Sequence, residues 1–522
     1  MNNGTVIFKA YTMAQPSLMP SSLDELIPED HLVRVVNRVI EKIDIQPLLE
    51  NYKGGGTSSY HPRMMLKVIV YGYAEKTYSC RRIAKALREN VNFMWIAGGN
   101  QPDFHTINDF RGNTMKEAVR AVFTKVLELL VEEGYIKLEN YFVDGTKIGA
   151  SANAHKVVWA KKTKHYQEKL QERIKALLDE IEQVNKQESQ EYGDADLEEL
   201  GGKGGMNSER LQKKVDELNV ELKKQSANKT LKKAVKTLEK EHLPRLKKYE
   251  QQEKVLAGRN SYSRTDPNAS NLRMKEDRAA QKPLARPAYN VQIGTENQFI
   301  VGYSVHQQAD DTTCFIPHME QQTFPHGRKP KNGCGDAGYG SEENYAWLEK
   351  NHIQNFLKYN TFYKEQHPPR KPELIEKARF QSHNFPYDPL QDVFTCPAQH
   401  PLTYRETKPY KTSNGYLSQR RFYECDHCPT CPLKPKCTKA KGNRRIQFSP
   451  KLQRYRQQAK DNLLSEQGVA LRQKRSVEPE TVFGDIKFNR SFRRFSLRKL
   501  NKVATEWGII SIAHNMRKLA AQ

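Results

Sequence analysis

The sequence lacks the features of a membrane or secreted protein. No long apolar span and no lipidation signal occurs among its 522 residues, which argues against a role at a membrane surface. Residues 1–20 contain no basic region leading into an apolar one, so no signal peptide is recognised. We therefore expect a cytoplasmic protein whose eight cysteines are reduced or metal-bound rather than paired in disulfides.

Acidic residues are scarce relative to basic ones. The chain has 61 Asp and Glu against 85 Lys and Arg, a formal charge of +24 at pH 7 and a pI near 9.5. Such an excess bears on binding partners rather than on fold, and it favours nucleic acid over mere solubility. A chain of this length can bury a sizeable core and is expected to hold several domains.

Residues 1–135 are predicted to form an all-α domain for DNA binding or dimerisation. The segment Ser79–Leu87 is typical of the first helix of a helix-turn-helix, because a serine cap precedes Arg81, Arg82 and an apolar stripe. An ordinary amphipathic helix explains the same pattern equally well. Further helices are predicted from Pro62, from Pro102 and over Val119–Glu133.

Residues 161–255 are predicted to leave the core as a helical arm. Apolar residues step by three and four along the segment, with Glu, Lys and Gln between them, and glycines at 201–205 separate two helical runs. We interpret the arm as an antiparallel coiled-coil hairpin of two helices. A solvated hairpin without chemistry is the favoured interpretation, and dimerisation or DNA contact is the alternative.

The remaining segments predict an α/β fold with a mixed sheet flanked by helices. Its first part comprises residues 136–160 and 256–361, and residues 446–522 supply a basic helical C-terminal part. The predicted elements are a strand at Tyr141–Ile148, a hairpin over Ala288–Val305, helices at Ile316–Gln321 and Ser341–Asn351, and a strand at Ile353–Tyr359.

Three acids in this core are candidate metal ligands. Asp144 ends an apolar run and precedes a glycine, which predicts a strand that delivers one carboxylate to its end and then turns. Alone this pair indicates only a turn. Asp336, in a glycine-rich stretch, and Glu480, on a basic helix, favour a three-carboxylate site for Mg²⁺. Two such ions about 4 Å apart can activate an attacking hydroxyl and stabilise the leaving oxygen of a phosphodiester.

Basic residues surround the third acid. Aromatic residues alternate with arginines over Phe488–Phe495, which suits a phosphate-contacting surface with apolar anchors. Glu480 and Lys487 are seven residues apart, so two helical turns would place a metal-holding carboxylate and a phosphate-binding lysine on one face. A solvated basic face is the alternative. The candidate DNA contacts here are Arg475, Lys487, Arg490, Arg493 and Arg494.

Five cysteines fall in residues 362–445, which we treat as an insertion. Clustered thiols in a cytosolic chain indicate metal before disulfide, and four of them would make a tetrahedral structural Zn²⁺ site. The ligands would be Cys396, Cys425, Cys428 and Cys437, or else Cys425, Cys428, Cys431 and Cys437. Reduced thiols without metal are the alternative. No histidine-partnered nucleophile motif accompanies them, so no catalytic cysteine is predicted.

Taken in order, these motifs resemble a DDE transposase of a bacterial insertion sequence. The resemblance extends over roughly residues 20–519. It implies a ribonuclease-H-like catalytic fold, cut-and-paste chemistry with two Mg²⁺ or Mn²⁺ ions, and binding to terminal inverted repeats and target DNA. It also implies a homodimer in the DNA complex and a nucleoid-associated location. The residues that carry it are Phe142–Thr146, Tyr289–Gln292, Gly335–Tyr339, the segment Val477–Lys487, Glu506–Gly508 and Ala513–Asn515.

The resemblance assigns the catalytic acids to Asp144, Asp336 and Glu480. Glu480 is preferred to Glu478 because six residues separate it from Lys487, as in the family pattern. That pattern also places a tyrosine and an arginine before the glutamate. Here the tyrosine is not matched and Arg475 stands one residue from the expected place, so hairpin formation at the DNA ends stays open. Two alternatives also stay open: a catalytically inactive sequence-specific DNA-binding protein, and a nuclease that does not join strands.

Overall fold

The computed structural model describes residues 22–50, 52, 59–192, 206–224, 229–274, 284–412 and 414–522. The chain divides into two compact units, residues 1–133 with Gly508–Gln522, and Gly134–Trp507. The predicted boundary falls after residue 135, and the last fifteen residues are predicted to belong to the core. In the structure these residues, which complete helix α19 (Leu500–Ala520), belong to the first unit instead. The glycines at 201–205, which are predicted to separate two helical runs of the arm, lie outside the described residues.

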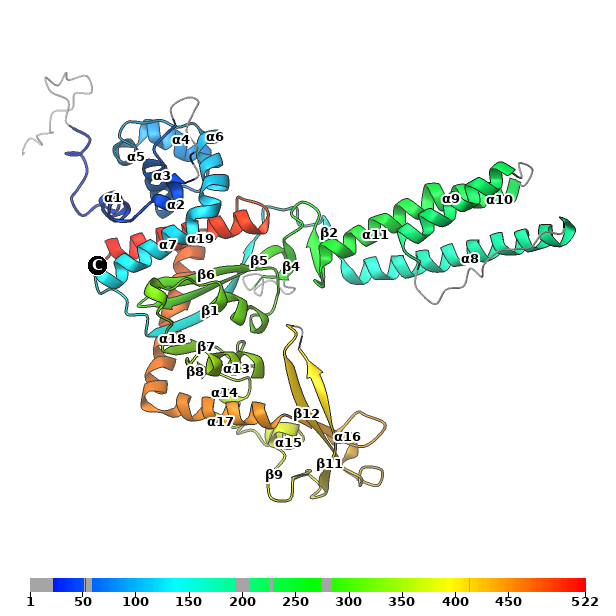
Figure 1. Cartoon of the computed structure of the whole chain (residues 1–522). Helices are drawn as coiled ribbons and strands as arrows, with labels where there is room; N and C mark the ends of the chain where they lie inside the picture. Colours follow the sequence, from blue (N-terminus) through cyan, green and yellow to red (C-terminus); the bar gives the residue numbers. More distant parts are fainter. Residues whose placement is uncertain are drawn as a thin grey trace, which may run out of the picture. The chain divides into compact units, whose positions relative to one another are not determined.

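All elements described between residues 22 and 133 are helical (Figure 1). The charged face of α4 stays in water because its buried side chains, Cys80, Ile83 and Leu87, line one stripe. Asn90 alone separates α4 from the six-residue α5, whereas a helix-turn-helix needs a turn of three to four residues. The amphipathic-helix interpretation therefore fits α4 better. The helices are α1 (Leu32–Lys42), α2 (Gln46–Leu49), α3 (Pro62–Ala74), α4 (Cys80–Glu89), α5 (Val91–Ile96), α6 (Phe104–Asp109), the π-helical Phe110–Thr114 and α7 (Met115–Glu132).

The second unit contains a mixed six-stranded sheet, which confirms the predicted α/β class. The central strand β1 pairs antiparallel with β5 and parallel with β7, and β7 pairs parallel with β8. Both β6 and β4 pair antiparallel with the other edge of β5, so the main order is β6-β5-β1-β7-β8. The strands are β1 (Asn140–Gly149), β4 (Ser270–Arg273), β5 (Ala285–Glu296), β6 (Phe299–His306), β7 (Asn332–Gly335) and β8 (Gln354–Leu357).

Two local predictions for the sheet have different outcomes. The hairpin is confirmed: β5 and β6 are joined at Asn297 and Gln298, both with positive φ, as a tight hairpin turn requires. The predicted turn after Asp144 is wrong, because β1 continues through Asp144 and Gly145 to Gly149. The glycine there accommodates a close approach of β5 rather than a turn, as described below.

Helices cover the sheet, and one apolar cluster fixes the helices over Pro450–Leu464 and Glu466–Gly484, the second of which carries Glu478 and Glu480. Phe142, Cys334 and Phe356, from β1, β7 and β8, pack with Leu463 and Leu471. The covering elements are α12 (Phe315–Glu320), α13 (Glu342–Lys350), α14 (Phe362–Gln366), α17 (Pro450–Leu464), α18 (Glu466–Gly484) and a π-helical turn, η7 (Asp485–Asn489).

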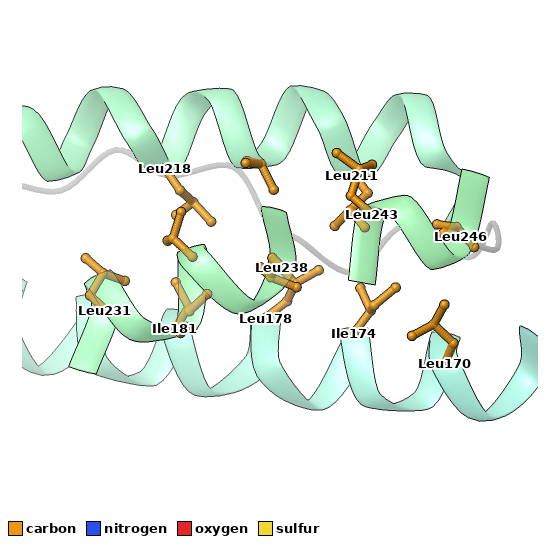
Figure 2. Close-up of a cluster of buried hydrophobic side chains, with 13 residues drawn as sticks. Leu170, Ile174, Leu178, Ile181, Leu211, Leu218, Leu231, Leu238, Leu243 and Leu246 are labelled. Carbon is orange, nitrogen blue, oxygen red and sulfur yellow. The ribbon is translucent and has the colours of Figure 1, made fainter. Parts of the chain in front are cut away.

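The arm contains more helices than predicted. One apolar cluster unites side chains from α8, α9 and the returning helices (Figure 2), so the arm is a three-membered bundle rather than a two-helix hairpin. The short strands β2 (Val157–Trp159) and β3 (Ser261–Ser263) pair where the arm begins and ends. The helices are α8 (Ala160–Tyr192), α9 (Ser208–Lys224), α10 (Lys229–Thr237), the π-helical Leu238–His242 and α11 (Leu243–Leu256).

The cysteine-containing insertion folds around its own small sheet, which the sequence analysis does not predict. The five strands follow the antiparallel order β13-β12-β11-β10-β9. Much of β11 and β12 is polar and exposed, so neither strand shows a clear apolar alternation. The strands are β9 (Tyr387–Asp388), β10 (Val393–Thr395), β11 (Pro401–Lys411), β12 (Leu417–Glu424) and β13 (Arg445–Phe448), with helices α15 (Pro372–Arg379) and α16 (Lys434–Cys437) beside them.

Candidate active site

The parallel strands deliver three charged side chains to one end of the sheet. Phe142 pairs with Cys334, and Cys334 pairs with Phe356. Side chains two residues apart on a strand point to the same face, and two residues beyond these three partners the chain carries Asp144, Asp336 and Lys358. The three side chains therefore start on the face that α17 and α18 cover.

Arg475 on α18 joins the three predicted acids. Its guanidinium nitrogens lie 3.7 Å from Asp144 Oδ1, 3.7 Å from Asp336 Oδ2 and 3.6 Å from Glu480 Oε1. Leu471 anchors this helix in the apolar cluster, and Arg475 follows one turn later on the same face. The Arg475 side chain is 12% exposed, against 43% for Asp336 and 58% for Glu480. Its Nε is buried without a hydrogen-bond partner among the described residues.

The two candidate glutamates of α18 occupy different environments. Glu478 is buried and its Oε2 accepts a hydrogen bond of 2.7 Å from the backbone N–H of Gln298, at the β5–β6 turn. Burial raises the pKa of Glu478 above its usual range. Glu480 is more than half exposed and faces Arg475. The geometry thus favours Glu480 as the site acid and gives Glu478 a structural contact.

Lys358 is a charged neighbour that the sequence analysis missed. Its backbone N–H donates to Gly335 O at 3.2 Å, directly before Asp336. Burial, followed by the charges of Arg475 and Arg472, lowers the pKa of Lys358 below that of an ordinary lysine. The available signal was its position near the end of the predicted strand Ile353–Tyr359; in the structure Lys358 directly follows β8, as Asp336 directly follows β7.

Behind β1, a buried hydrogen-bond network supports the acid-bearing segments. Gln292 and Asn290 are wholly buried on β5. Gln292 Nε2 donates to Asp311 Oδ1 at 3.0 Å, and Asn290 Nδ2 donates to the same oxygen at 2.7 Å. The hydroxyl of Tyr339 donates to Gln292 Oε1. The network thereby connects β5 to the turn after Asp336.

Gly145 makes room for this network. It pairs with Gln292 across the β1–β5 ladder, and a Cβ at Gly145 would stand 2.1 Å from Gln292 Nε2 and 2.8 Å from Asp311 Oδ1. No side chain fits at those separations. Glycine is therefore required directly after Asp144 because another side chain occupies the space, not because the chain turns there.

The turn that carries Asp336 is fixed by short polar contacts. Asp336 Oδ1 accepts a 2.8 Å hydrogen bond from the backbone N–H of Gly338, an arrangement that stabilises tight turns. The Thr312 hydroxyl donates to Gly338 O, and Asn344 Nδ2 donates to Tyr339 O at 2.8 Å. Burial, with the charges of Asp144, Asp311 and Asp336, raises the pKa of Tyr339 well above its usual range, so Tyr339 stays a neutral donor.

Lys487 lies elsewhere than predicted. It is buried, and its Nζ donates to the Thr146 hydroxyl of β1 at 3.1 Å. The seven-residue spacing from exposed Glu480 assumed a regular α-helix, but α18 ends at Gly484 and continues as the wider π-helical turn η7. The structure therefore gives Lys487 a contact with the sheet, and its burial disfavours the predicted contact with DNA phosphate.

The other predicted DNA-binding arginines differ in exposure. Arg493 and Arg494 are exposed; Arg494 Nε donates to Ala150 O at 3.0 Å, beyond the end of β1, and Arg493 Nε donates to Lys487 O at 3.2 Å. Arg490 forms a 3.9 Å ion pair with Asp485. In the first unit, Arg81 and Arg82 are exposed on α4, as are Lys85 and Arg88.

The five insertion cysteines converge on one small cavity, described below, and all are free thiols. Across the described ranges, no set of three or more His, Cys, Asp or Glu side chains is already arranged to hold a metal ion. At the acid site Arg475 occupies the middle of the carboxylates. Within the same ranges, no helix combines the length and apolar character needed to cross a membrane.

Two family models match the chain, and both describe transposases. Residues 21–113 match a transposase domain (DUF772), and residues 395–520 match a transposase DDE domain. The second match includes Arg475, Glu480 and the five insertion cysteines, whereas Asp144 and Asp336 lie outside both matches. No curated protein and no solved structure matches the chain.

Both matches indicate the same class of protein: the chain is a transposase. More closely, it is a DDE transposase of the insertion-sequence type, as the resemblance predicts. The transposase DDE domain belongs to enzymes that cleave DNA and transfer its strands, and this chain is accordingly an enzyme that acts on DNA.

Proposed function

We propose that this transposase binds the terminal inverted repeats of its own element, cleaves the DNA there and joins the ends to target DNA. The catalytic residues are Asp144, Asp336 and Glu480. The observation that carries the proposal is the position of Arg475, within 3.6–3.7 Å of a carboxylate oxygen from each of these acids. The three acids come from three separate elements that are far apart in the sequence, and all three lie beside the guanidinium of Arg475.

The topology supports a ribonuclease-H-like core. The first three strands of the main order, β1, β5 and β6, are antiparallel, and β7 and β8 run parallel to β1. This arrangement puts the first acid on the central strand and the second beyond its parallel neighbour. The third acid comes from α18, which packs over the same face.

The donor set fits hard divalent cations. Carboxylate oxygens are the ligands that Mg²⁺ and Mn²⁺ prefer, and the three acids already surround a positive charge. Asp144, Asp336 and Glu480 would hold two Mg²⁺ or Mn²⁺ ions. Bound there, the ions would activate the attacking hydroxyl and stabilise the leaving oxygen.

The chain's own residues position the DNA around these acids. Lys358 and Arg475 lie beside the carboxylates and can pair with the phosphate being cut, since a cation there offsets its charge. With metal held by the acids, the Arg475 guanidinium would be available for phosphate. The exposed Arg493 and Arg494, and Arg81 and Arg82 on the first unit, supply phosphate contacts farther along the duplex. A homodimer in the DNA complex would hold both ends of the element.

The test is cleavage of an end-labelled duplex that carries the element's own terminal repeat, with Mg²⁺, followed by addition of a target plasmid. Wild type, Asp144→Asn and Glu480→Gln are compared with Glu478→Gln. The control retains an acceptor for the Gln298 N–H and lies two residues from the proposed ligand. Gel-shift binding of the same duplex is measured for every variant.

We expect wild type and Glu478→Gln to cut at the repeat boundary and to join the cut ends to the plasmid. Asp144→Asn and Glu480→Gln should bind the repeat but lose at least about 100-fold in cleavage, because a metal ligand is missing. Binding without cleavage by wild type would support an inactive DNA-binding protein, and cutting without joining a nuclease. Loss of cleavage in Glu478→Gln alone would overturn the choice of third acid.

A further inference from the structure

We propose that Cys396, Cys425, Cys428 and Cys437 bind one structural zinc ion within the insertion. The proposal is independent of the catalytic acids. All four thiols, together with Cys431, line one cavity of about 20 Å³, which is roughly the room that a single water or metal ion needs.

The small sheet brings these cysteines together from two connections. Cys396 directly follows β10, at the turn into β11. Cys425 directly follows β12, and the same connection to β13 contains Cys428 and ends helix α16 at Cys437. Because β10, β11, β12 and β13 are consecutive neighbours in the sheet, the turn and the longer connection meet at one end of it. The turn supplies Cys396 and the longer connection supplies the other three, including the close Cys425-x2-Cys428 pair, a spacing that is typical of structural zinc sites.

Backbone amides already point at three of the sulfurs. The N–H of His400 donates to Cys396 Sγ at 3.3 Å, and the N–H of Arg444 donates to Cys428 Sγ at 3.3 Å. The N–H of His427 donates to Cys425 Sγ. Donors of this kind stabilise sulfur that carries negative charge and orient it as a ligand.

Charge around the cavity also suits a metal thiolate. Binding Zn²⁺ would release one proton from each of the four thiols to solvent and leave a complex with two negative charges. Arg444 and Lys434 line the cavity and offset that charge. The buried Nε of Arg444 has no hydrogen-bond partner among the described residues.

The fourth ligand is assigned to Cys437 rather than Cys431 on packing. Cys396, Cys425 and Cys428 are buried in one cluster, and Cys437 packs against it while Cys431 does not. The thiols do not yet form a closed site. Because all four line the same cavity, rotation about their side-chain bonds can bring sulfur to the Zn–S distance of about 2.3 Å.

The experiment measures metal in the full-length protein without DNA. Protein purified without chelator is assayed for zinc by mass spectrometry, and zinc is then exchanged for Co²⁺, whose absorption reports thiolate ligation and tetrahedral geometry. The variants are Cys428→Ser and Cys437→Ser. The matched control is Cys431→Ser, which removes a thiol from the same cavity. Circular dichroism shows whether each variant is folded.

We expect one zinc per wild-type chain, tetrahedral thiolate bands with Co²⁺, and a loss of at least about tenfold in zinc affinity for Cys428→Ser and Cys437→Ser. Cys431→Ser should keep the metal. Wild type with less than about one tenth of an equivalent of zinc and no cobalt–thiolate bands would overturn the site. The wild-type spectrum decides this even if a serine variant fails to fold. Loss of zinc in Cys431→Ser, with retention in Cys437→Ser, would overturn the proposed ligand set. Cleavage of DNA enters none of these readouts.

Discussion

Replacing Gly145 with alanine should disable the protein although it adds a single methyl group. The new Cβ would stand 2.1 Å from Gln292 Nε2 and 2.8 Å from Asp311 Oδ1. Gln292 cannot easily move away, since it is wholly buried and is held by Asn290, Asp311 and Tyr339. Either β1 shifts away from β5, or Gln292 gives up its hydrogen bonds.

The expected loss of stability follows from these two structural responses. Forcing an extra methyl into a packed interior costs about 1–3 kcal/mol, and a buried polar group that loses its partner costs about 1–3 kcal/mol. The two outcomes are alternatives in part, so we expect a loss of roughly 2–4 kcal/mol in the free energy of unfolding of the second unit. A shift of β1 also moves Asp144, the adjacent residue, and a displacement of a catalytic group by about 1 Å lowers rates by around 100-fold.

The assay is urea unfolding followed by tryptophan fluorescence, together with terminal-repeat cleavage. The matched control is Gly484→Ala at the end of α18, where a Cβ would meet no described atom within 4 Å. That change should be neutral or stabilise by up to about 1 kcal/mol, since alanine favours helix over glycine.

A double variant makes the reasoning refutable. If the methyl group acts mainly through Gln292, then Gly145→Ala combined with Gln292→Ala should lose much less stability than the sum of the two single losses, because the contact with Gln292 is gone and only the approach to Asp311 Oδ1 remains. Additive losses, or full stability of Gly145→Ala, would show that the β1–β5 contact is not what requires glycine.

Two further predictions follow from exposure and charge. Cleavage should fall at alkaline pH, and the fall should begin at a lower pH than an ordinary lysine would give, because the lowered pKa of Lys358 makes this side chain lose its proton and its attraction for phosphate sooner. Lys358→Arg should move the fall to higher pH. An unchanged pH profile in this variant would exclude Lys358 from phosphate binding. Replacing the exposed Arg81 and Arg82 with alanine should weaken binding to the terminal repeat. It should also reduce the slope of log affinity against log salt by about one for each phosphate that is no longer neutralised. Lys487→Met, at a buried position, should leave that slope unchanged; a smaller slope for Lys487→Met and an unchanged slope for the arginine variant would contradict these assignments.

Much of the site was predictable from sequence order, because each acid sits beside a local pattern. The apolar run before Asp144, the glycines around Asp336 and the spacing of Glu480 identified residues that the structure brings to one arginine. The hairpin of β5 and β6 was predictable for the same reason: its alternation and turn are local.

The remaining features depend on contacts between distant segments. Asp-Gly usually marks a turn, and only the position of Gln292, far along the chain, shows that Gly145 is there for space. The contact of Lys487 with Thr146 depends on a π-helical turn that no spacing rule anticipates. The small sheet was missed because its strands are largely polar, and the third arm helix because apolar stripes do not reveal how many helices share a core.

The most direct test of the central claim is to map the metal position with Fe²⁺, which can replace Mg²⁺ among carboxylates and, with ascorbate and peroxide, cuts the nearby backbone. We expect cuts at three places, in β1 near Asp144, in the turn at Asp336 and in α18 near Glu480, all suppressed by excess Mg²⁺ and by Asp144→Asn. Cuts confined to other segments, or cuts that Mg²⁺ does not suppress, would contradict the claim that these three acids form one metal-binding active site.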